Sequence, residues 1–307
     1  AFAGGGALNV KLNQRIIARP DVKELFVQPA SGDSGTAVGA ASYVSVARGV
    51  PVEKMEHVYL GPAYTNEEVI AACERHPSKP SWQRIANGDT EVPQRIARLL
   101  AEGQPVAWFQ GRMEFGPRAL GARSILGDAR SRKMQSVMNV KIKFRESFRP
   151  FAPAVLREDV STFFEMRPNE DSPYMLLVAP VRGEKLLPIE SRGEKGLDKL
   201  KQVRSVVPAI THVDNSARVQ TIDPERNPRF YGIAQAFKRL TGSPVLINTS
   251  FNVRGEPIVN TPADSYRCFM HTNMDALVLE NYVLLKTEQP EAKEIDVAAY
   301  LAEFGND

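Results

Sequence analysis

The sequence has little cysteine and histidine and no long apolar run. Its 307 residues include two cysteines, Cys73 and Cys268, too few for the disulfide framework of a small secreted protein, which favours a reducing, cytoplasmic setting. No stretch approaches the roughly 18 consecutive apolar residues of a membrane span, so we expect no membrane partner. Residues 1–6 lack an initiator methionine and the basic and apolar regions of a signal peptide. We therefore expect one piece of a longer cytoplasmic chain.

Length and composition are those of a globular protein with about two domains. Hydrophobic residues make up 43% of the chain and charged residues 24%, which excludes a disordered or fibrous protein. We find no internal repeat and no low-complexity tract. Segments of helical periodicity alternate with short apolar segments, and this alternation predicts an α/β fold.

Periodicity and turn residues place the expected elements. Thr65 and Glu68 have the spacing of a capping box, and Thr261 followed by Pro262 is typical of a helix start. Residues 76–88 read as a linker, and the tail from Lys286, with two lysines against six acidic residues, as a peripheral segment. We expect helices over 36–48 (closely packed), 65–75, 93–102, 229–241, from 261 onward and over 298–304, and strands over 23–28, 105–110, 243–248 and 276–285.

Positive charge is concentrated in one segment. The net charge of the chain is +3, but residues 112–149 contain ten basic and three acidic residues, so this segment carries +7 and the rest of the chain carries −4. Such a concentration attracts a polyanion, either nucleic acid or a nucleotide phosphate. The alternative is a basic face that is simply solvated.

Two glycine-containing segments near the start could bind ligands. Gly4–Asn9 contains three glycines that would let backbone amides approach a nucleotide, although it matches neither a Walker loop nor a dinucleotide fingerprint, and a plain tight turn is the simpler interpretation. Asp33 stands between an expected strand and an expected helix. It could cap the helix or contribute to a metal site.

Basic residues recur in two segments of the central region. In Gly111–Gly121, Arg112 and Arg118 follow an expected strand, where α/β folds tend to bind ligands. If Lys141–Pro150 is extended, its odd positions present cationic and polar side chains on one face and its even positions present Ile142, Phe144 and Phe148 to a core. This stripe suits a triphosphate, and the alternative is an edge strand whose lysines prevent aggregation.

Two later segments are rich in polar groups. Thr211–Gln220 is typical of a hairpin in which His212 and Asp214 could share a face and bind a metal, although a structural histidine is the simpler interpretation. Arg218 of this segment is a candidate phosphate ligand. Asn248–Pro257 follows an expected strand with hydroxyl, amide and guanidinium groups, which suits a small polar ligand.

Three of these segments together resemble the ATP-dependent O-carbamoyltransferases, whose members include enzymes of nodulation-factor and antibiotic biosynthesis. The stretches GRMEFGPRALGARSILGD and NTSFNVRGEP are long and specific, and the resemblance extends from near the first residue to about Val283. It implies a YrdC-like twisted-sheet α/β domain, preceded by the C-terminal remnant of an actin/sugar-kinase-like (ASKHA) domain. The implied organisation is an ASKHA-like carbamoyl-transfer part over 1–62, a connecting helix and linker over 63–92, the YrdC-like domain over 93–290 and an acidic tail over 291–307.

The resemblance also implies an activity. The YrdC-like domain would form carbamoyl-adenylate from ATP and carbamoyl phosphate, and the complete enzyme would pass the carbamoyl group to a hydroxyl of a small-molecule acceptor. The earlier half of the first domain, which brings metal-binding histidines, has no counterpart here and is the expected partner. This piece alone could carry only the adenylation half-reaction. The implied cofactors are ATP with Mg²⁺, and Fe²⁺ or a similar divalent metal in the complete enzyme.

Site residues follow from the resemblance position by position. It assigns catalysis to Arg118, Lys143 and Arg149 and implies Asp33 as a metal ligand whose partner ligands are missing. The chemistry agrees, because adenylation brings two anions together and cations must screen their repulsion and stabilise the leaving pyrophosphate. We find no Ser-His-Asp or Cys-His arrangement, and none is needed. The implied substrate- and nucleotide-binding residues are Arg218, Ser250, Asn252, Arg254, Gly5, Gly6 and Asn9.

Two other functions remain open. The basic segment could bind RNA, but Phe144 and Phe148 stack on bases only if exposed, and the alternation predicts that they are buried. The resemblance supplies a reason for this alternative, because YrdC-like folds have relatives that bind double-stranded RNA, but the expected burial of the two rings counts against a nucleic-acid partner. The chain could also be a non-catalytic nucleotide-binding module.

Overall fold

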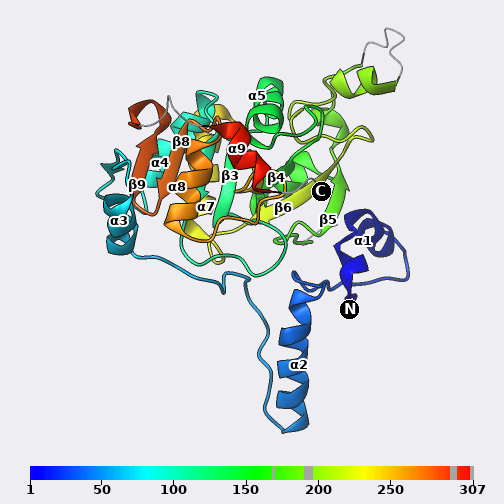
Figure 1. Ribbon diagram of the computed structural model, residues 1–307. Coiled ribbons are helices and arrows are strands. Elements are labelled where there is room, and N and C mark those ends of the chain that lie inside the picture. Colours follow the sequence, from blue (N-terminus) through cyan, green and yellow to red (C-terminus); the bar gives the residue numbers. More distant parts are fainter. Residues whose placement is uncertain (168–169, 190–195, 291–295, 305–307) are drawn as a thin grey trace.

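The computed structural model describes residues 1–167, 170–189, 196–290 and 296–304. Its centre is a mixed nine-stranded sheet in the order β1-β9-β8-β2-β3-β7-β4-β6-β5 (Figure 1). Pairing is parallel between β2 and β8 and between β4 and β6, and antiparallel at the other neighbours. This confirms a mixed α/β fold. The strands are β1 (Gln83–Arg84), β2 (Val106–Phe109), β3 (Arg123–Asp128), β4 (Ala152–Leu156), β5 (Leu177–Pro180), β6 (Ser216–Ile222), β7 (Val245–Ser250), β8 (Ala276–Leu279) and β9 (Tyr282–Leu285).

Helices cover both faces of the sheet. Alternate strand residues point to opposite faces, so in β2 Val106 and Trp108 join one core, and Ala107 and Phe109 join the other. The first core lies under α4 and α7, which pack against each other. The second lies under α3, α5, α8 and α9. The bounds are α3 (Asn66–Arg75), α4 (Glu91–Ala101), α5 (Arg132–Val137), α6 (Val160–Phe163), α7 (Pro228–Thr241), α8 (Pro262–Met270) and α9 (Val297–Ala302).

Local sequence sets the helix ends. Thr65 and Thr261 both form capping boxes, in which the threonine oxygen accepts from the third helical amide and the acidic side chain at that position returns the bond. Asn227 caps α7, and Gly242, with φ of 75°, ends it. The expected helices over 65–75, 93–102, 229–241 and from 261 are confirmed, and each expected end lies within two residues of the observed one.

The N-terminal part is organised differently. A short turn η1 (Gly5–Leu8) leads into α1 (Val10–Ile17), which packs against β5. The next helix, α2 (Ser34–Ala47), projects away from the body and buries no residue (Figure 1). The expectation of a closely packed helix is therefore wrong for this structure. The strand expected over 23–28 is reduced to a single bridge between Val27 and Phe2.

Three further expectations are corrected. The apolar run 276–285 is two strands, β8 and β9, because the polar pair Glu280-Asn281 forms a turn in which Glu280 has φ of 51°. The linker over 76–88 contains the short strand β1, which pairs with β9. The tail is not peripheral throughout, since Tyr300 in α9 is only 2% exposed. Residues 291–295 and 305–307 of the expected acidic tail lie outside the described residues.

No helix within the described residues has the length and apolar character needed to cross a bilayer.

Candidate functional site

Four arginines line one cavity. The cavity has a volume of about 350 Å³ and lies beside the start of β4 and the end of β7, which meet at one edge because these strands are antiparallel. Its described lining contains no carboxylate. A cavity with this lining attracts an anion. The arginines are Arg118, Arg145, Arg149 and Arg218.

Two of these arginines hold buried nitrogen atoms without partners. The Nε atoms of Arg118 and Arg218 have no hydrogen-bond partner among the described residues. Burial lowers the pKa of Arg118, and burial together with the neighbouring Arg118 and Arg145 lowers the pKa of Arg218 to about 9. Guanidinium groups in this situation are destabilised by each other and by loss of water, so a bound anion would relieve both costs. Their planar donor fork suits phosphate oxygens.

Lys143 lies next to the cavity and contacts Ser250, which lines it. Its Nζ donates to the Oδ1 and main-chain oxygen of Asn252, both at 2.7 Å, to Ser250 Oγ at 3.2 Å and to the main-chain oxygen of Ser250. The side chain is 4% exposed. Burial, and next the charge of Arg145, lowers the pKa of Lys143 to about 7. The site can therefore change its charge near neutral pH.

The segment that carries Lys143 is not the expected strand. Helix α5 continues into a wider turn, η2 (Met138–Ile142), and Phe144 has φ of 48°. Buried Asn139 organises the loop that follows: its Nδ2 donates to the main-chain oxygen of Arg149 at 2.8 Å, and its Oδ1 accepts from Arg145 Nε at 2.8 Å. Lys143, Arg145 and Arg149 lie close together because the loop folds around the side-chain amide of Asn139. They do not lie together because alternate residues of a strand share a face.

The loop that carries Arg118 is held by two amides for which the sequence analysis expects no role. Asn248 Nδ2 donates to Gln220 Oε1 at 2.7 Å and to the main-chain oxygen of Ala119 at 3.2 Å. Gln220 Nε2 donates to the main-chain oxygen of Leu120 at 2.8 Å. Both amides are fully buried in β7 and β6. For Asn248, which follows the apolar residues Val245–Ile247 in β7, a polar residue at the end of an apolar run is the signal that could have revealed it, whereas β6 around Gln220 offers no such signal.

Two buried charged residues of Gly111–Asp128 were also missed. Glu114 Oε1 accepts from the amides of Leu120 and Ala122, both at 2.7 Å. Arg123 is fully buried and donates to four main-chain oxygens, those of Gln110, Gly111, Ala122 and Pro62. Glu114 and Arg123 therefore hold in place the loop that contains Arg118 and the chain segment that leads into this loop.

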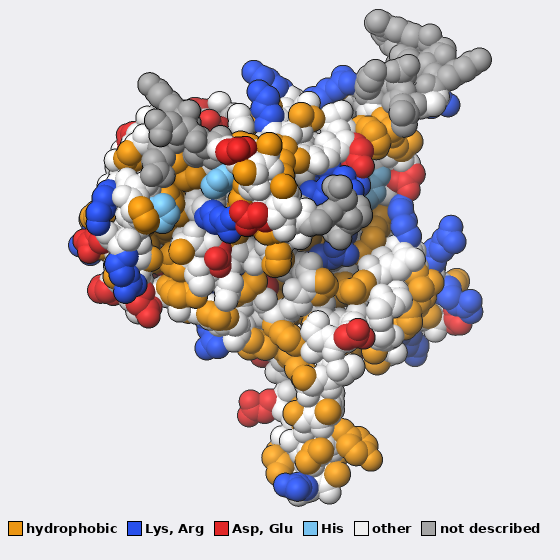
Figure 2. Space-filling view, in the orientation of Figure 1, with side chains coloured by type: hydrophobic (Ala, Val, Ile, Leu, Met, Phe, Trp, Pro, Cys, Tyr) orange, Lys and Arg blue, Asp and Glu red, His pale blue; other side chains and the backbone are white. Residues whose placement is uncertain are grey.

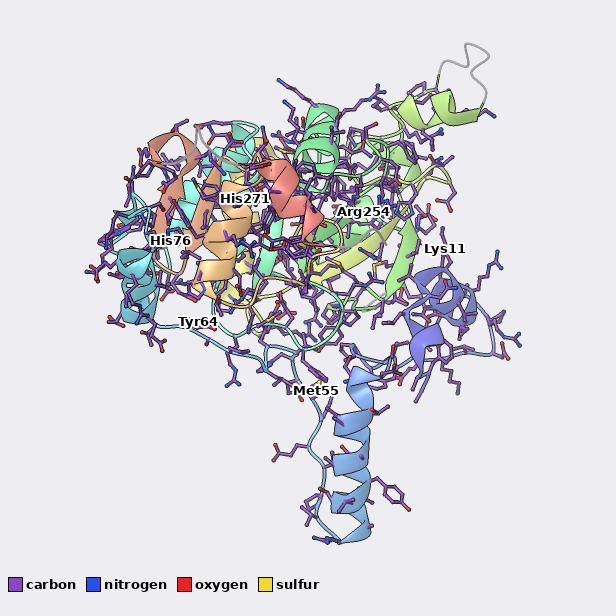
Figure 3. The ribbon with its side chains drawn as sticks, in the orientation of Figure 1. Lys11, Met55, Tyr64, His76, Arg254 and His271 are labelled. Carbon is purple, nitrogen blue, oxygen red and sulfur yellow. The ribbon has the colours of Figure 1, made fainter. Side chains whose placement is uncertain are left out.

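The remaining predicted residues occupy other positions. Gly5 and Gly6 are exposed in η1, and Asn9 caps α1 by accepting from the amide of Leu12 at 3.2 Å. None of the three lines the cavity, although Val10, the next residue, does. Arg254 is exposed on the loop after β7 (Figure 3). Whether these residues contact substrate stays a prediction.

Asp33 does not form a metal site with the residues around it. It is exposed at the start of α2 and makes no side-chain cap there. Within the described part of the chain, no group of three or more His, Cys, Asp or Glu residues is placed to hold a metal ion. The residues present therefore do not fit a complete metal centre.

The segment Thr211–Gln220 is not a hairpin. Strand β6 begins at Ser216 and pairs with β4 and β5, whereas residues 211–213 are not in a strand. His212 lines the cavity, and its Nδ1 lies 3.3 Å from Ser216 Oγ. Asp214 accepts from Lys11 Nζ and from Ser216 Oγ, both at 2.5 Å. Asp214 is thus engaged by donors, and the structural interpretation, which concerned His212, stays a prediction.

A second cavity adjoins the first. Its volume is about 560 Å³, and it shares Arg149, Pro150 and His212 with the arginine-lined cavity. Apolar side chains, including Phe148 and Val213, contribute to its wall. Phe148 is 40% exposed, so its expected burial is wrong, whereas Phe144 is half-buried. A polar pocket beside a larger and less polar one suits a ligand with an anionic part and a flat or apolar part.

Comparison with known families decides what kind of protein carries this site. Residues 97–286 match the family described as "Carbamoyltransferase C-terminus", and residues 1–42 match "Carbamoyltransferase N-terminus". The chain belongs to the carbamoyltransferase family. The C-terminal match contains all three segments in which the sequence resembles that family, so the resemblance is confirmed. The four arginines of the cavity also lie within this match.

Individual relatives agree. The chain is 53% identical to the uncharacterised Synechocystis protein sll1178 over 95% of this chain and 48% of that protein. It is 38% identical to the nodulation protein NolNO of Sinorhizobium fredii over 95% of this chain and 40% of that protein. A solved structure of full-length HypF, in a phosphate- and nucleotide-bound form, is similar at a TM-score of 0.41 and 17% identity, over 65% of this chain and 22% of that one. The chain spans about half the length of its curated relatives.

Proposed function

We propose that this chain forms carbamoyl-adenylate from ATP and carbamoyl phosphate, as the YrdC-like half of an ATP-dependent O-carbamoyltransferase. One observation carries the proposal: the cavity lined by four arginines, in which the Nε atoms of Arg118 and Arg218 have no partner. Water first cleaves carbamoyl phosphate to carbamate and phosphate, and a carbamate oxygen then attacks the α-phosphorus of ATP while pyrophosphate leaves, so negative charge is concentrated in a small volume. Arginines that are already in place stabilise that charge without reorganisation.

Each part of the site has a task in this reaction. Arg118, Arg218 and Arg145 bind the phosphates, and Arg149, at the junction of the two cavities, contacts the ligand on both sides. The larger cavity accepts the nucleoside. Lys143 holds Ser250 and Asn252 in position and adds a positive charge beside the phosphates when it is protonated. Mg²⁺ enters with ATP and neutralises part of its charge.

ATP–pyrophosphate exchange tests the proposal. Exchange that requires both carbamoyl phosphate and Mg²⁺ is expected from this chain, and Arg218→Met is expected to abolish it. The matched control is Arg98→Met, which removes an exposed arginine from α4, on a helix that covers the sheet away from the cavity. ATP binding without exchange would indicate a nucleotide-binding module, and no ATP binding would contradict the site.

The second half-reaction, transfer to a hydroxyl of a small molecule, belongs in our proposal to the longer protein. The carbamoyltransferase N-terminus matches only residues 1–42, and α2, which begins in this part and ends at Ala47, exposes its apolar residues (Figure 2). Tyr43 is 77% exposed and Val46 65%. We therefore propose that the remainder of the N-terminal domain covers α2 and completes the metal and acceptor sites. Amide exchange of α2 should slow at least tenfold when that remainder is present in the same polypeptide.

RNA binding is a second candidate, because Phe148 is exposed beside Arg149 and could stack on a base. A steep loss of RNA affinity with salt at a defined stoichiometry would support it, and weak binding without saturation would reject it.

A further inference from the structure

The C-terminal helix α9 lies outside the part of the chain that matches the carbamoyltransferase C-terminus, which ends at residue 286. It nevertheless contributes Tyr300, whose side chain is 2% exposed, to the core on one face of the sheet. Figure 1 shows α9 beside α8, across the same face. Because Tyr300 is buried in this core, the tail segment that carries it packs at a defined position on the sheet.

Aromatic and ionic contacts with α8 fix this place. The ring of Tyr300 stacks on His271, which follows α8, with ring centroids 4.3 Å apart and an interplanar angle of 23°. Phe304 packs edge-on against the Tyr300 ring, with ring centroids 5.2 Å apart. Arg267 of α8 lies over the Tyr300 ring and forms an ion pair with Glu303. The tail is therefore attached through several independent contacts.

From this position Tyr300 reaches the loop that surrounds Lys143. Its hydroxyl donates to Glu256 Oε1, and Glu256 Oε2 accepts from the amide of Val253 at 2.7 Å. Asn252 Nδ2 donates to the main-chain oxygen of Glu256 at 2.6 Å, and Asn252 Oδ1 accepts from Lys143 Nζ at 2.7 Å. An unbroken set of hydrogen bonds thus joins the tail to Lys143 through the loop.

We propose that the segment Asp296–Phe304 acts as a strap, in which Tyr300 positions Glu256 and thereby the loop that holds Lys143 beside the anion cavity. Tyr300 and Glu256 are positioning residues, because neither lines the cavity. Burial, and next the nearby Cys268 and Glu256, raises the pKa of Tyr300, so its hydroxyl keeps its proton and remains a donor. The consequence for anion binding rests on the proposed function, whereas the link from Tyr300 to Lys143 does not.

The test is Tyr300→Phe in the full chain, which removes one hydroxyl and keeps the ring stack on His271. Two quantities are measured: the titration of Lys143, by NMR of ¹³C- and ¹⁵N-labelled lysine, and the affinity for pyrophosphate by calorimetry at pH 5.5, where Lys143 is protonated in both proteins. The charged and titratable groups that face Lys143 are Arg145 on its own loop, Glu256 on the loop after β7 and Cys268 on α8. A loosened loop admits water to Nζ, so the midpoint should rise from about 7 toward the ordinary lysine value.

The matched control is Tyr231→Phe. Tyr231 also donates its hydroxyl to a carboxylate, Glu158 Oε1 at 2.7 Å, but it lies on α7 at the opposite face. We expect Tyr300→Phe to weaken pyrophosphate binding about fivefold, the usual effect of one hydrogen bond, and Tyr231→Phe to leave both measurements unchanged. If Tyr300→Phe fails to fold, Glu256→Gln tests the same link by replacing the charged acceptor.

The outcomes separate the strap from the proposed function. A changed Lys143 midpoint with unchanged pyrophosphate affinity supports the strap and rejects a contribution of the Lys143 loop to anion binding, whereas no pyrophosphate binding by the unaltered chain rejects the anion site. An unchanged midpoint in both Tyr300→Phe and Glu256→Gln overturns the strap, whatever the affinity. Equal effects of Tyr231→Phe and Tyr300→Phe also overturn it, because they would reflect general destabilisation.

Discussion

Arg123 and Arg218 are two arginines of one sheet, on β3 and β6, that use their charge in opposite ways. Arg123 is fully buried, donates to four main-chain oxygens and lies 3.5 Å from the centroid of the Phe109 ring. Arg218 is half-buried, lines a cavity and has a buried Nε without a partner among the described residues. In the sequence, both are basic residues within the part of the chain that resembles the O-carbamoyltransferases. Only the groups that they contact in the structure distinguish them.

The difference teaches how to separate structural from functional arginines. A guanidinium surrounded by main-chain oxygens donates hydrogen bonds to the protein's own carbonyl groups, and its removal leaves these buried acceptors unpaired. A guanidinium that faces other cations, as Arg218 faces Arg118 and Arg145, raises the free energy of the empty site. A bound anion would stabilise such an arrangement.

The largest expected effect is on stability, from Arg123→Met. The change leaves four carbonyl oxygens without this donor and removes the charge that faces buried Glu114, so we expect a loss of about 3–5 kcal/mol in the free energy of unfolding. Urea unfolding measures it. The control Arg98→Met, on an exposed surface, should change stability by about 0.5 kcal/mol or less. Equal midpoints for the two variants would contradict a structural role for Arg123.

Arg218→Met should produce the opposite pattern. We expect pyrophosphate affinity to fall about 100-fold, because a partner of a desolvated ion pair is lost. Stability should stay the same or rise, since a charge repelled by Arg118 and Arg145 is removed. Calorimetry and urea unfolding on the same preparation provide the two measurements. A marked loss of stability with unchanged affinity would place Arg218 in the structural class with Arg123.

Lys143 should make anion binding depend on pH. Its pKa in the free site is about 7, and a bound anion raises that pKa because negative charge favours the ammonium form. Above pH 7 binding therefore takes up a proton, so affinity should fall as pH rises and be highest below pH 7. Sulfate, which does not titrate in this range, is the probe.

Lys143→Met serves as the control for this pH dependence. It should bind sulfate more weakly at pH 6 and lose the decline above pH 7. A decline that persists in Lys143→Met would show that another group titrates.

The smallest expected effect is that of Arg254→Met. Arg254 is exposed and does not line either cavity, so its interaction with a bound anion is screened by solvent and salt. We expect about a twofold loss of pyrophosphate affinity at low salt and none at 0.5 M salt. A loss as large as that of Arg218→Met would mean that the loop after β7 closes over the ligand.

Local chemistry made much of the fold predictable. Thr65 with Glu68, and Thr261 with Asp264, place two helix starts correctly because a cap depends only on neighbouring residues. The run 276–285 was misread because a strand and a hairpin have the same apolar pattern until pairing partners are known. Helix α2 was misjudged because small apolar residues predict burial without saying what buries them.

Some residues assigned to the site by the resemblance line the cavity, namely Arg118, Arg149, Arg218 and Ser250, but their roles stay predictions and the geometry was not predicted. Lys143, Arg145 and Arg149 do converge, yet through a wide helical turn and buried Asn139, not through an extended stripe. The alternation argument failed because period two holds only in a strand, and nothing local distinguishes a strand from this turn. Gln220 and Asn248 had no visible role because their partners lie about 100 residues or more away in Arg118's loop.

The sequence by itself determined the family, the helix starts and the concentration of positive charge in residues 112–149, because these depend on residue identity and short spacing. Only the tertiary structure decided which cations face a cavity and which satisfy the backbone. It also decided that the tail reaches Lys143 through Tyr300 and Glu256. The physical reason is that burial and hydrogen bonding depend on which residues are close in space. These two effects change the free energy of a charged group far more than the residues next to it in the sequence do.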